Sequence, residues 1–172
     1  GGPDRMDVDR IFVEAMARPT LVYTSVLFVL GNVDDADESA PASGARAEHE
    51  RMVLDAGGAV IRPGMIHGDD AWLFANPMVI GDGSNRWPLV HRDDAAELYR
   101  VVVEQRARGV FHAMTEVRRA RDVFPHVAGT PLEEARKELG GFADALALDQ
   151  NVRAERSRAL GWVGRIHFGD SL

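Results

Sequence analysis

The sequence predicts an α/β fold: a short parallel sheet of about three strands, flanking helices and a C-terminal helical cap. Helical and strand-like patterns alternate through residues 4–115, which is typical of a parallel sheet. Residues 20–29 form a near-continuous apolar run, as in a strand covered on both faces. Helical patterns dominate residues 116–172. We expect one domain, 1–172, because domains usually hold roughly 100–200 residues.

The first half of the chain begins with an amphipathic helix over 4–18, in which apolar residues recur at three- and four-residue steps. Pro19 ends it, and a strand follows over 20–29. Residues 32–44 are acidic and rich in Pro, Ser and Ala, which predicts a loop. A second helix covers 45–56 and stops at two glycines.

Residues 59–61 predict a short buried strand that runs into Arg62-Pro63-Gly64. Residues 65–80 show no periodicity and are expected to be irregular. After a third helix that ends near Arg108, residues 110–114 predict another strand. These strands, with the one at 20–29, make up the expected parallel sheet.

Residues 81–96 read as a turn, a strand and a helix start. Gly81 and Gly83 suit a turn that needs positive φ. Pro88 places the strand at a sheet edge or at a strand start. Asp94, with Glu97 three residues later, predicts the cap of the helix over 94–108.

The C-terminal part predicts three helices. Thr130-Pro131-Leu132-Glu133 has the residues of a helix start, with a capping threonine and a proline at the first position. This helix ends near Gly140-Gly141. Two shorter helical stretches follow, at 142–148 and 152–160, and the Arg-rich stretch at 118–121 is interpreted as a solvated face.

Composition excludes several classes of function. The chain has no cysteine, which excludes disulfides, cysteine nucleophiles and thiolate metal sites. The formal charge of −7 argues against a nucleic-acid partner, since phosphate binding needs a basic face. No run approaches the ~20 apolar residues of a membrane span, and no signal peptide is visible. We expect a cytoplasmic protein without membrane contact.

A set of ordered motifs resembles the NAD-dependent epimerase/dehydratase family, the extended and atypical short-chain dehydrogenases. The stretch at 81–96 is similar to the family's "GdG…vHvdDvA" segment. The resemblance covers about 4–162 and includes these further motifs in the same order: Val22-Tyr23-Thr24-Ser25 leading to Gly31, Asp37-Glu38-Ser39, Glu50, Arg62-Pro63-Gly64 leading to Gly68, and Leu160-Gly161-Trp162.

The resemblance implies a truncated Rossmann-like sheet whose N-terminal nucleotide-binding half is missing. The helix at 4–18 would correspond to the one before the family's fifth strand. No G-x-G-x-x-G or G-x-x-G-x-x-G follows a strand in this sequence. Residues 4–115 would be the residual Rossmann-like part, and 116–172 the substrate-side cap. We therefore expect no bound cofactor, and no useful affinity of the isolated chain for NAD(H) or NADP(H).

The family's oxidoreductase centre is also missing. Its Tyr-x-x-x-Lys pair would fall at Ala42 and Arg46, counting back from Glu50. Lys137 is the only lysine, so neither tyrosine of the chain has a lysine four residues later. The family's catalytic Ser or Thr would fall at Val26, one residue beyond Ser25. Classical hydride transfer is therefore not expected.

The candidate site residues come from what remains. His67 and Asp70 form a possible acid/base pair near neutral pH, and His91 is a third catalytic candidate. Each has a structural alternative: His67 as a loop histidine, and His91 as an anchor between strand and helix. The resemblance places the substrate pocket beside the strand end at 24–25 and the turn at 62–68. The proposed substrate-binding residues are Thr24, Ser25, Arg62 and Asp94.

A metal site from His67, Asp69 and Asp70 is possible in principle. No paired-histidine spacing supports it, so we expect no metal. Arg62 has its own structural alternative, in which it braces the loop or an acidic residue.

Three functional hypotheses remain. The first is a shortened epimerase/dehydratase-type protein that binds a small organic substrate and catalyses a non-redox isomerisation or cyclisation. The second is a non-catalytic binding module, or half of a split NAD(P)-dependent enzyme. The third, a fragment of an ordinary enzyme of the family, conflicts with the lost catalytic residues. The uncharged strand at 20–26 would have an open edge, so we expect a homodimer or a partner chain that covers it.

Overall fold

The central sheet of the molecule has three parallel strands. The computed structural model describes residues 21–68 and 75–170, and the expected helix at 4–18 lies outside them. The strands are β1 (Val22–Thr24), β3 (Ala59–Pro63) and β7 (Gly109–Ala113), in the order β1-β3-β7. This arrangement confirms the predicted α/β class and a parallel sheet of about three strands.

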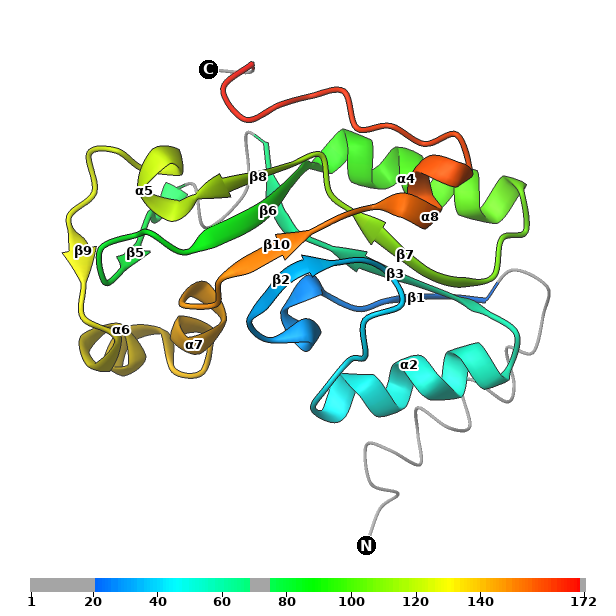
Figure 1. Ribbon diagram of the computed structural model, residues 1–172, viewed down its shortest axis with the longest axis horizontal. Coiled ribbons are helices and arrows are strands. Elements are labelled where there is room, and N and C mark those ends of the chain that lie inside the picture. Colours follow the sequence, from blue (N-terminus) through cyan, green and yellow to red (C-terminus); the bar gives the residue numbers. More distant parts are fainter. Residues whose placement is uncertain (1–20, 69–74, 171–172) are drawn as a thin grey trace, which may run out of the picture.

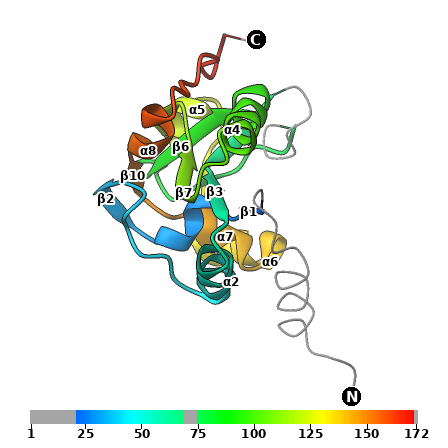
Figure 2. The same cartoon turned by 90° about the vertical axis from the view of Figure 1, so that its right-hand side faces the viewer.

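Two helices cover opposite faces of this sheet. Helix α2 (Ala45–Asp55) and helix α4 (Arg92–Glu104) lie on either side of it in both views (Figures 1 and 2). Alternate residues of β3 serve the two layers: Val60 packs in the cluster on the α2 side and Ile61 in the cluster on the α4 side. All five residues of β3 are buried. An apolar run without alternation is the pattern expected of such a strand.

The apolar run at 20–29 is a strand only in part. β1 ends at Thr24, and Leu27–Leu30 form a short 3-10 helix. Leu27, Val29 and Leu30 are buried in the core nevertheless. The prediction of a strand to Val29 was wrong because burial alone does not distinguish a strand from a buried helical turn.

A second sheet stands next to the first and has mixed direction. β6 (Arg86–His91) is its central strand, parallel to β4 (Met65–His67) and antiparallel to β8 (Glu116–Arg119). The expectation of irregular structure at 65–80 was therefore wrong for β4. It was also wrong for β5 (Val79–Ile80), which pairs with β9 (Gly129–Thr130).

Pro88 lies on this central strand, so its predicted place at an edge or a strand start was wrong. Pro88 pairs with Val117 of β8, and the pairing of β6 with β4 begins one residue later, at Leu89. The backbone of Gly64 lies close to Pro88 here. A Cβ on residue 64 would lie 2.4 Å from the Pro88 carbonyl oxygen, so the position requires glycine. A proline is tolerated here because the ladder to β4 starts beyond it.

The C-terminal part folds back onto the first half. β10 (Gln150–Val152) pairs in parallel with β2 (Val33–Ala36), a strand inside the segment predicted to be a loop at 32–44. The helices of this part are α5 (Ala120–Val123), α6 (Leu132–Leu139), α7 (Phe142–Leu146) and α8 (Glu155–Ala159).

Thr130 does not cap α6, contrary to the prediction. It lies in β9 and pairs with Ile80 of β5, and the cap position is taken by Pro131. The helix ends at Gly140 (φ 57°), as expected. Residues 116–172 thus pair with the first half of the chain through β8 and β10.

Candidate functional site

Two histidines stand side by side where β4 and β6 end. His67 is the last residue of β4, and His91 is the last residue of β6 and its direct partner in the ladder. Their ring centroids are 5.2 Å apart, with the ring planes at 67°. The two residues are 4% and 6% exposed. The structure therefore brings together two of the predicted catalytic residues at the carboxyl ends of parallel strands, where α/β proteins bind ligands.

His91 also begins helix α4. Its Nδ1 accepts the backbone N–H of Asp93 at 3.2 Å, so His91 is the N-cap. The prediction that Asp94 caps the helix was wrong, because the helix begins two residues earlier. A ring nitrogen that accepts a hydrogen bond carries no proton, and the proton of a neutral His91 ring is then on Nε2. That Nε2 is next to Gly68: a Cβ on Gly68 would lie 3.4 Å from it.

His67 lies in an apolar and mixed-charge environment. Burial is the main cause that lowers the pKa of His67, and the neighbouring His91 lowers it further. Glu116 and Asp94 oppose this shift. The ring of Phe168 packs edge-on against the His67 ring, at 5.6 Å between centroids. His67 is therefore a neutral base at neutral pH. Asp70, the third catalytic candidate, lies outside the described residues, as does Asp69.

Asp94 anchors the C-terminal segment. Its Oδ2 accepts the backbone N–H groups of Arg165 and Ile166, both at 2.8 Å. Its carbonyl oxygen accepts the indole N–H of Trp162 at 2.9 Å. Asp94 is 7% exposed. A carboxylate that accepts two backbone N–H groups is fixed in its conformation, and one of its oxygens is occupied.

Arg62, predicted to bind substrate, forms a buried ion pair with Glu50 of helix α2. Its Nη2 and Nε donate to the Glu50 carboxylate at 2.7 to 3.2 Å, and its Nη1 donates to the Ala40 carbonyl at 3.1 Å. Both side chains of the ion pair are less than 5% exposed. The structural alternative for Arg62, bracing of a loop and an acidic residue, describes this arrangement.

Thr24 and Ser25 point to opposite faces of the sheet at the end of β1. The exposed Thr24 hydroxyl accepts the phenol O–H of Tyr99 at 2.8 Å, and burial raises the pKa of that phenol. Ser25 is fully buried, and its backbone N–H donates to Ile61. Asp94 thus lies beside the histidines, while the other three substrate-binding candidates lie where β1 and β3 end.

Three residues beside the histidines were not predicted: Glu116, Arg118 and Phe168. The Glu116 carboxylate accepts the Arg118 Nε–H and the Phe168 backbone N–H, both at 2.6 Å. The Arg118 guanidinium lies over the Phe168 ring, 6.0 Å from its centroid. Phe168 is about a hundred residues from His67 in the chain, so no local sequence pattern connects them.

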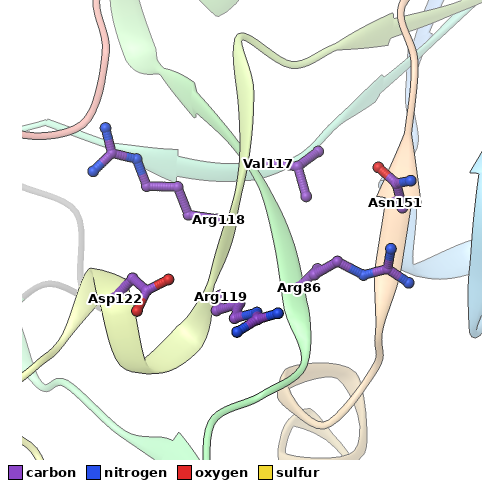
Figure 3. A pocket seen from close by; sticks show the side chains of 6 residues that line it. All are labelled: Arg86, Val117, Arg118, Arg119, Asp122 and Asn151. Carbon is purple, nitrogen blue, oxygen red and sulfur yellow. The ribbon is translucent and has the colours of Figure 1, made fainter.

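A hollow of about 520 Å³ opens beside β8 and β10. It is lined by Arg86, Val117, Arg118, Arg119, Asp122 and Asn151 (Figure 3). Arg86 is held by Asp149 and Asp34 at 2.7 to 2.9 Å. Within the described ranges the exposed Arg119 side chain has no ion pair or hydrogen bond. Figure 3 shows the Arg118 guanidinium turned away from Arg86 and Asn151.

The most informative comparisons are with solved structures. Human epimerase family protein SDR39U1, solved with NADPH, has a TM-score of 0.78 and 16% identity, over 97% of this chain and 70% of its own. The UDP-glucose 4-epimerase of Thermus thermophilus, solved with NAD, has a TM-score of 0.72 and 17% identity, over 95% and 65%. The dTDP-glucose 4,6-dehydratase of Streptomyces venezuelae has a TM-score of 0.71 and 15% identity, over 96% of this chain and 62% of its own. The chain has the fold of the NAD-dependent epimerases and dehydratases.

The sequence is similar to those of two yeast proteins. The uncharacterized protein C2A9.02 of Schizosaccharomyces pombe is 30% identical over 96 residues, and the uncharacterized protein YLL056C of Saccharomyces cerevisiae is 32% identical over 94 residues. Each match covers 48% of this chain but only 32% of the yeast protein. No model of a known protein family matches the sequence.

Within residues 21–68 and 75–170, the side chains and helix starts do not fit the nicotinamide dinucleotide that the fold implies. Its pyrophosphate needs a helix N-terminus reached from a strand through a glycine-rich turn. Helix α4 directly follows β6, but its first turn carries Asp93 and Asp94, which would repel phosphate. Helix α2 starts after a long loop, and Ala42, the position of the family's tyrosine, precedes its first residue.

The described residues also contain no cluster of three or more metal-ligating side chains. None of the helices in the described part of the chain is long and apolar enough to cross a membrane.

Proposed function

We propose that this chain is the substrate-side part of an epimerase/dehydratase-type protein. It binds a small organic substrate and catalyses a non-redox step of the isomerisation or cyclisation type. The observation that carries this proposal is the contact between His67 and His91 at the ends of β4 and β6. Two imidazoles in contact supply a base and a hydrogen-bond donor without a cofactor.

The two rings would have different roles. His67, whose pKa is lowered by burial, accepts a proton from a carbon next to a carbonyl or carboxyl group of the substrate. His91 holds its proton on Nε2 because Nδ1 is occupied by the Asp93 N–H, and this Nε2–H donates a hydrogen bond to the carbonyl or carboxyl oxygen, while the protonated His67 returns a proton to the same carbon or to its neighbour. One proton leaves the substrate and one is added, so no electron acceptor is needed.

The other predicted site residues take supporting roles in this proposal. Asp70, which follows His67 by three residues in the chain, would orient the His67 ring. Thr24 and Ser25 would contact the substrate at the end of β1. Arg62 and Asp94 would position the loops around the site, because Glu50 and the C-terminal backbone already occupy their polar groups.

The test follows proton exchange rather than redox chemistry. UDP-glucuronic acid, a ligand of the similar protein MoeE5, has a C5 hydrogen next to a carboxylate, and a nucleotide-linked 4-keto sugar has still more acidic hydrogens. We expect the purified chain in D2O, without any dinucleotide, to exchange such a hydrogen in at least one of these probes, as followed by proton NMR.

Replacement of either histidine by asparagine should slow this exchange by about 10²–10⁴-fold. Asparagine at position 91 keeps an acceptor for the helix cap, so loss of activity would not reflect loss of the helix. Exchange that survives in both variants, or that appears only after NAD is added, would contradict the proposal.

A second candidate is a non-catalytic binding module, or half of a split NAD(P)-dependent enzyme. The arginine-lined hollow beside β8 and β10 favours it, because Arg119 offers a guanidinium to an anionic group. Calorimetry with UDP should then show binding that Arg119→Ala weakens about tenfold or more, while Arg121→Ala outside the hollow leaves it unchanged. NAD(H) and NADP(H) should not bind the isolated chain at low micromolar concentration.

Under either candidate function, we propose that a second chain packs against the free edge of β1. Among the described residues β1 pairs only with β3, and residues 21–30 carry no charge that would protect its other edge. We propose a homodimer or a partner chain at this edge. Light scattering should give at least twice the 18.8 kDa chain mass, and Val22→Lys should reduce it.

A further inference from the structure

The C-terminal residues 162–168, which we call the strap, cross the molecule without forming a helix or a strand. In Figure 1 they run in red from the end of α8 over α4 towards the second sheet. Trp162 is buried at the start of the strap, whereas Val163 is 60% exposed. The strap is therefore anchored at one end and borders solvent along most of its length.

Two carboxylates hold the strap against the body. Asp94 of α4 accepts the N–H groups of Arg165 and Ile166, and Glu116 of β8 accepts the N–H of Phe168. Glu116 is also 3.6 Å from His167 Nδ1. Backbone N–H groups usually donate to other backbone groups, but these three strap groups donate to side chains.

A glycine allows the strap to sit this close. A Cβ on Gly164 would lie 2.1 Å from Thr115 Oγ1 and 2.9 Å from Thr115 Cβ. Thr115 precedes Glu116 at the start of β8, so any side chain at position 164 would push the strap away from the residue that holds it. The fit is specific to a glycine at this position.

The strap covers His67, one member of the histidine pair. Phe168 packs on His67, and the Arg118 guanidinium lies over the same phenyl ring. His67 and His91 are 4% and 6% exposed, so a substrate cannot reach either ring without movement of the groups packed around the pair, of which Phe168 is one. We propose that the strap is a gate over His67 and His91, held shut by Asp94 and Glu116, and that its release admits the substrate. This inference rests on the proposed function only in taking the pair as the site to be reached.

The bonding of the strap makes local release possible. A segment held by a few hydrogen bonds to side chains, with no ladder and little buried apolar surface, opens at a fraction of the global unfolding free energy. Release breaks three backbone hydrogen bonds to two carboxylates and the contacts of one phenyl ring. The β1-β3-β7 sheet contributes nothing to these contacts and would stay folded.

Chemical accessibility of the histidines tests the gate without any substrate. The purified chain is treated with diethyl pyrocarbonate, and the modification rates of His67 and His91 are followed by mass spectrometry of their peptides. We expect Phe168→Ala and Gly164→Ala to raise both rates on the order of tenfold. Val163→Ala, an exposed position on the same strap, is the matched control and should leave both rates unchanged.

Amide hydrogen exchange separates gating from unfolding. In Gly164→Ala and Glu116→Gln the amides of Arg165, Ile166 and Phe168 should exchange faster, while those of β3 and β7 should keep their protection. Unchanged histidine modification in both Phe168→Ala and Gly164→Ala, or an equal increase in Val163→Ala, would overturn the gate.

The gate and the proposed reaction can fail independently. Fast modification in the strap variants without proton exchange in any probe would contradict the reaction and leave the gate intact. If the chain catalyses proton exchange but the strap variants show unchanged histidine modification, the gate would be contradicted and the reaction would stand.

Discussion

At the carboxyl end of β3, Arg62 meets Glu50, whereas at the carboxyl end of β4, His67 meets His91. Both pairs are buried, and both lie where parallel strands end. The first pair joins opposite charges through a bidentate contact. Its polar groups already bind each other and the Ala40 carbonyl, so they are not available to a ligand. The second joins two imidazoles, of which His67 is held neutral by its surroundings because burial lowers its pKa.

The difference shows that position at a strand end does not by itself make a site. A guanidinium paired with a carboxylate stabilises the helix–sheet contact and is chemically inert near pH 7. Two neighbouring imidazoles contribute less to stability but can give and take a proton. Predictions that separate stability from proton chemistry therefore sharpen the comparison.

The largest loss of stability is expected for Glu50→Ala, which leaves the Arg62 guanidinium buried without its counter-charge. We expect the free energy of unfolding in urea to fall by about 3–5 kcal/mol. The control is Glu48→Ala on the same helix, where the partner Arg51 is exposed and the change should stay within about 0.5 kcal/mol. A loss at position 50 no larger than this control would show that the ion pair is not what fixes α2 to β3.

A smaller loss is expected for His91→Ala, which removes the N-cap of α4. The expected cost is about 0.5–2 kcal/mol, because the Asp93 N–H loses its acceptor. His91→Asn should recover most of this stability in the same unfolding measurement. Equal losses for the two substitutions would mean that packing of the imidazole, rather than capping, is what the position requires.

The third prediction concerns pH. Burial lowers the pKa values of His67 and His112 in the folded chain, so between the folded and unfolded values the unfolded chain binds more protons. The stabilisation is complete above the unfolded value of about 6.5 and is lost as the pH falls towards and below the folded values. Urea unfolding from pH 7.5 to 5 should show this loss, and His67→Asn should make it less steep. If the unfolding free energy of His67→Asn depends on pH as steeply as that of the wild type, the effect comes from other groups, such as His112.

The smallest effect is expected for Tyr99→Phe, which removes the hydrogen bond to Thr24 at the end of β1. This bond lies at the surface, and its loss should cost at most about 0.5–1.5 kcal/mol by thermal or urea unfolding. Thr24→Val should have a similar effect, and the double variant should cost less than the sum of the two. Full additivity would show that the two hydroxyl groups do not interact in solution.

Much of the second sheet could not be predicted because its strands are too short to show a period. β4 has three residues and β8 has four, and three of the four residues of β8 are charged, so an arginine-rich strand was interpreted as a solvated face. Their strand conformation comes from pairing with β6. Short segments take their conformation from a neighbour more than from their own propensity.

Of the candidate site, the two histidines were named from the sequence, but their contact and three of the residues beside them were not. Position after a strand or turn singled out His67 and His91, while their contact depends on the register of β4 against β6. The gate over them depends on Asp94 and Glu116, whose carboxylates bind backbone groups some 50 to 70 residues away in the chain.

The sequence by itself determined the α/β class and the helices predicted at 45–56 and 94–108, because patterns of apolar residues record burial on one face or two. It also determined that no Tyr-x-x-x-Lys pair is present. Only the tertiary structure decided which polar groups stay available, since Arg62 and Asp94 were taken by partners distant in sequence. The physical reason is that a side chain's chemistry depends on the groups packed against it, and long-range packing leaves no mark in local sequence.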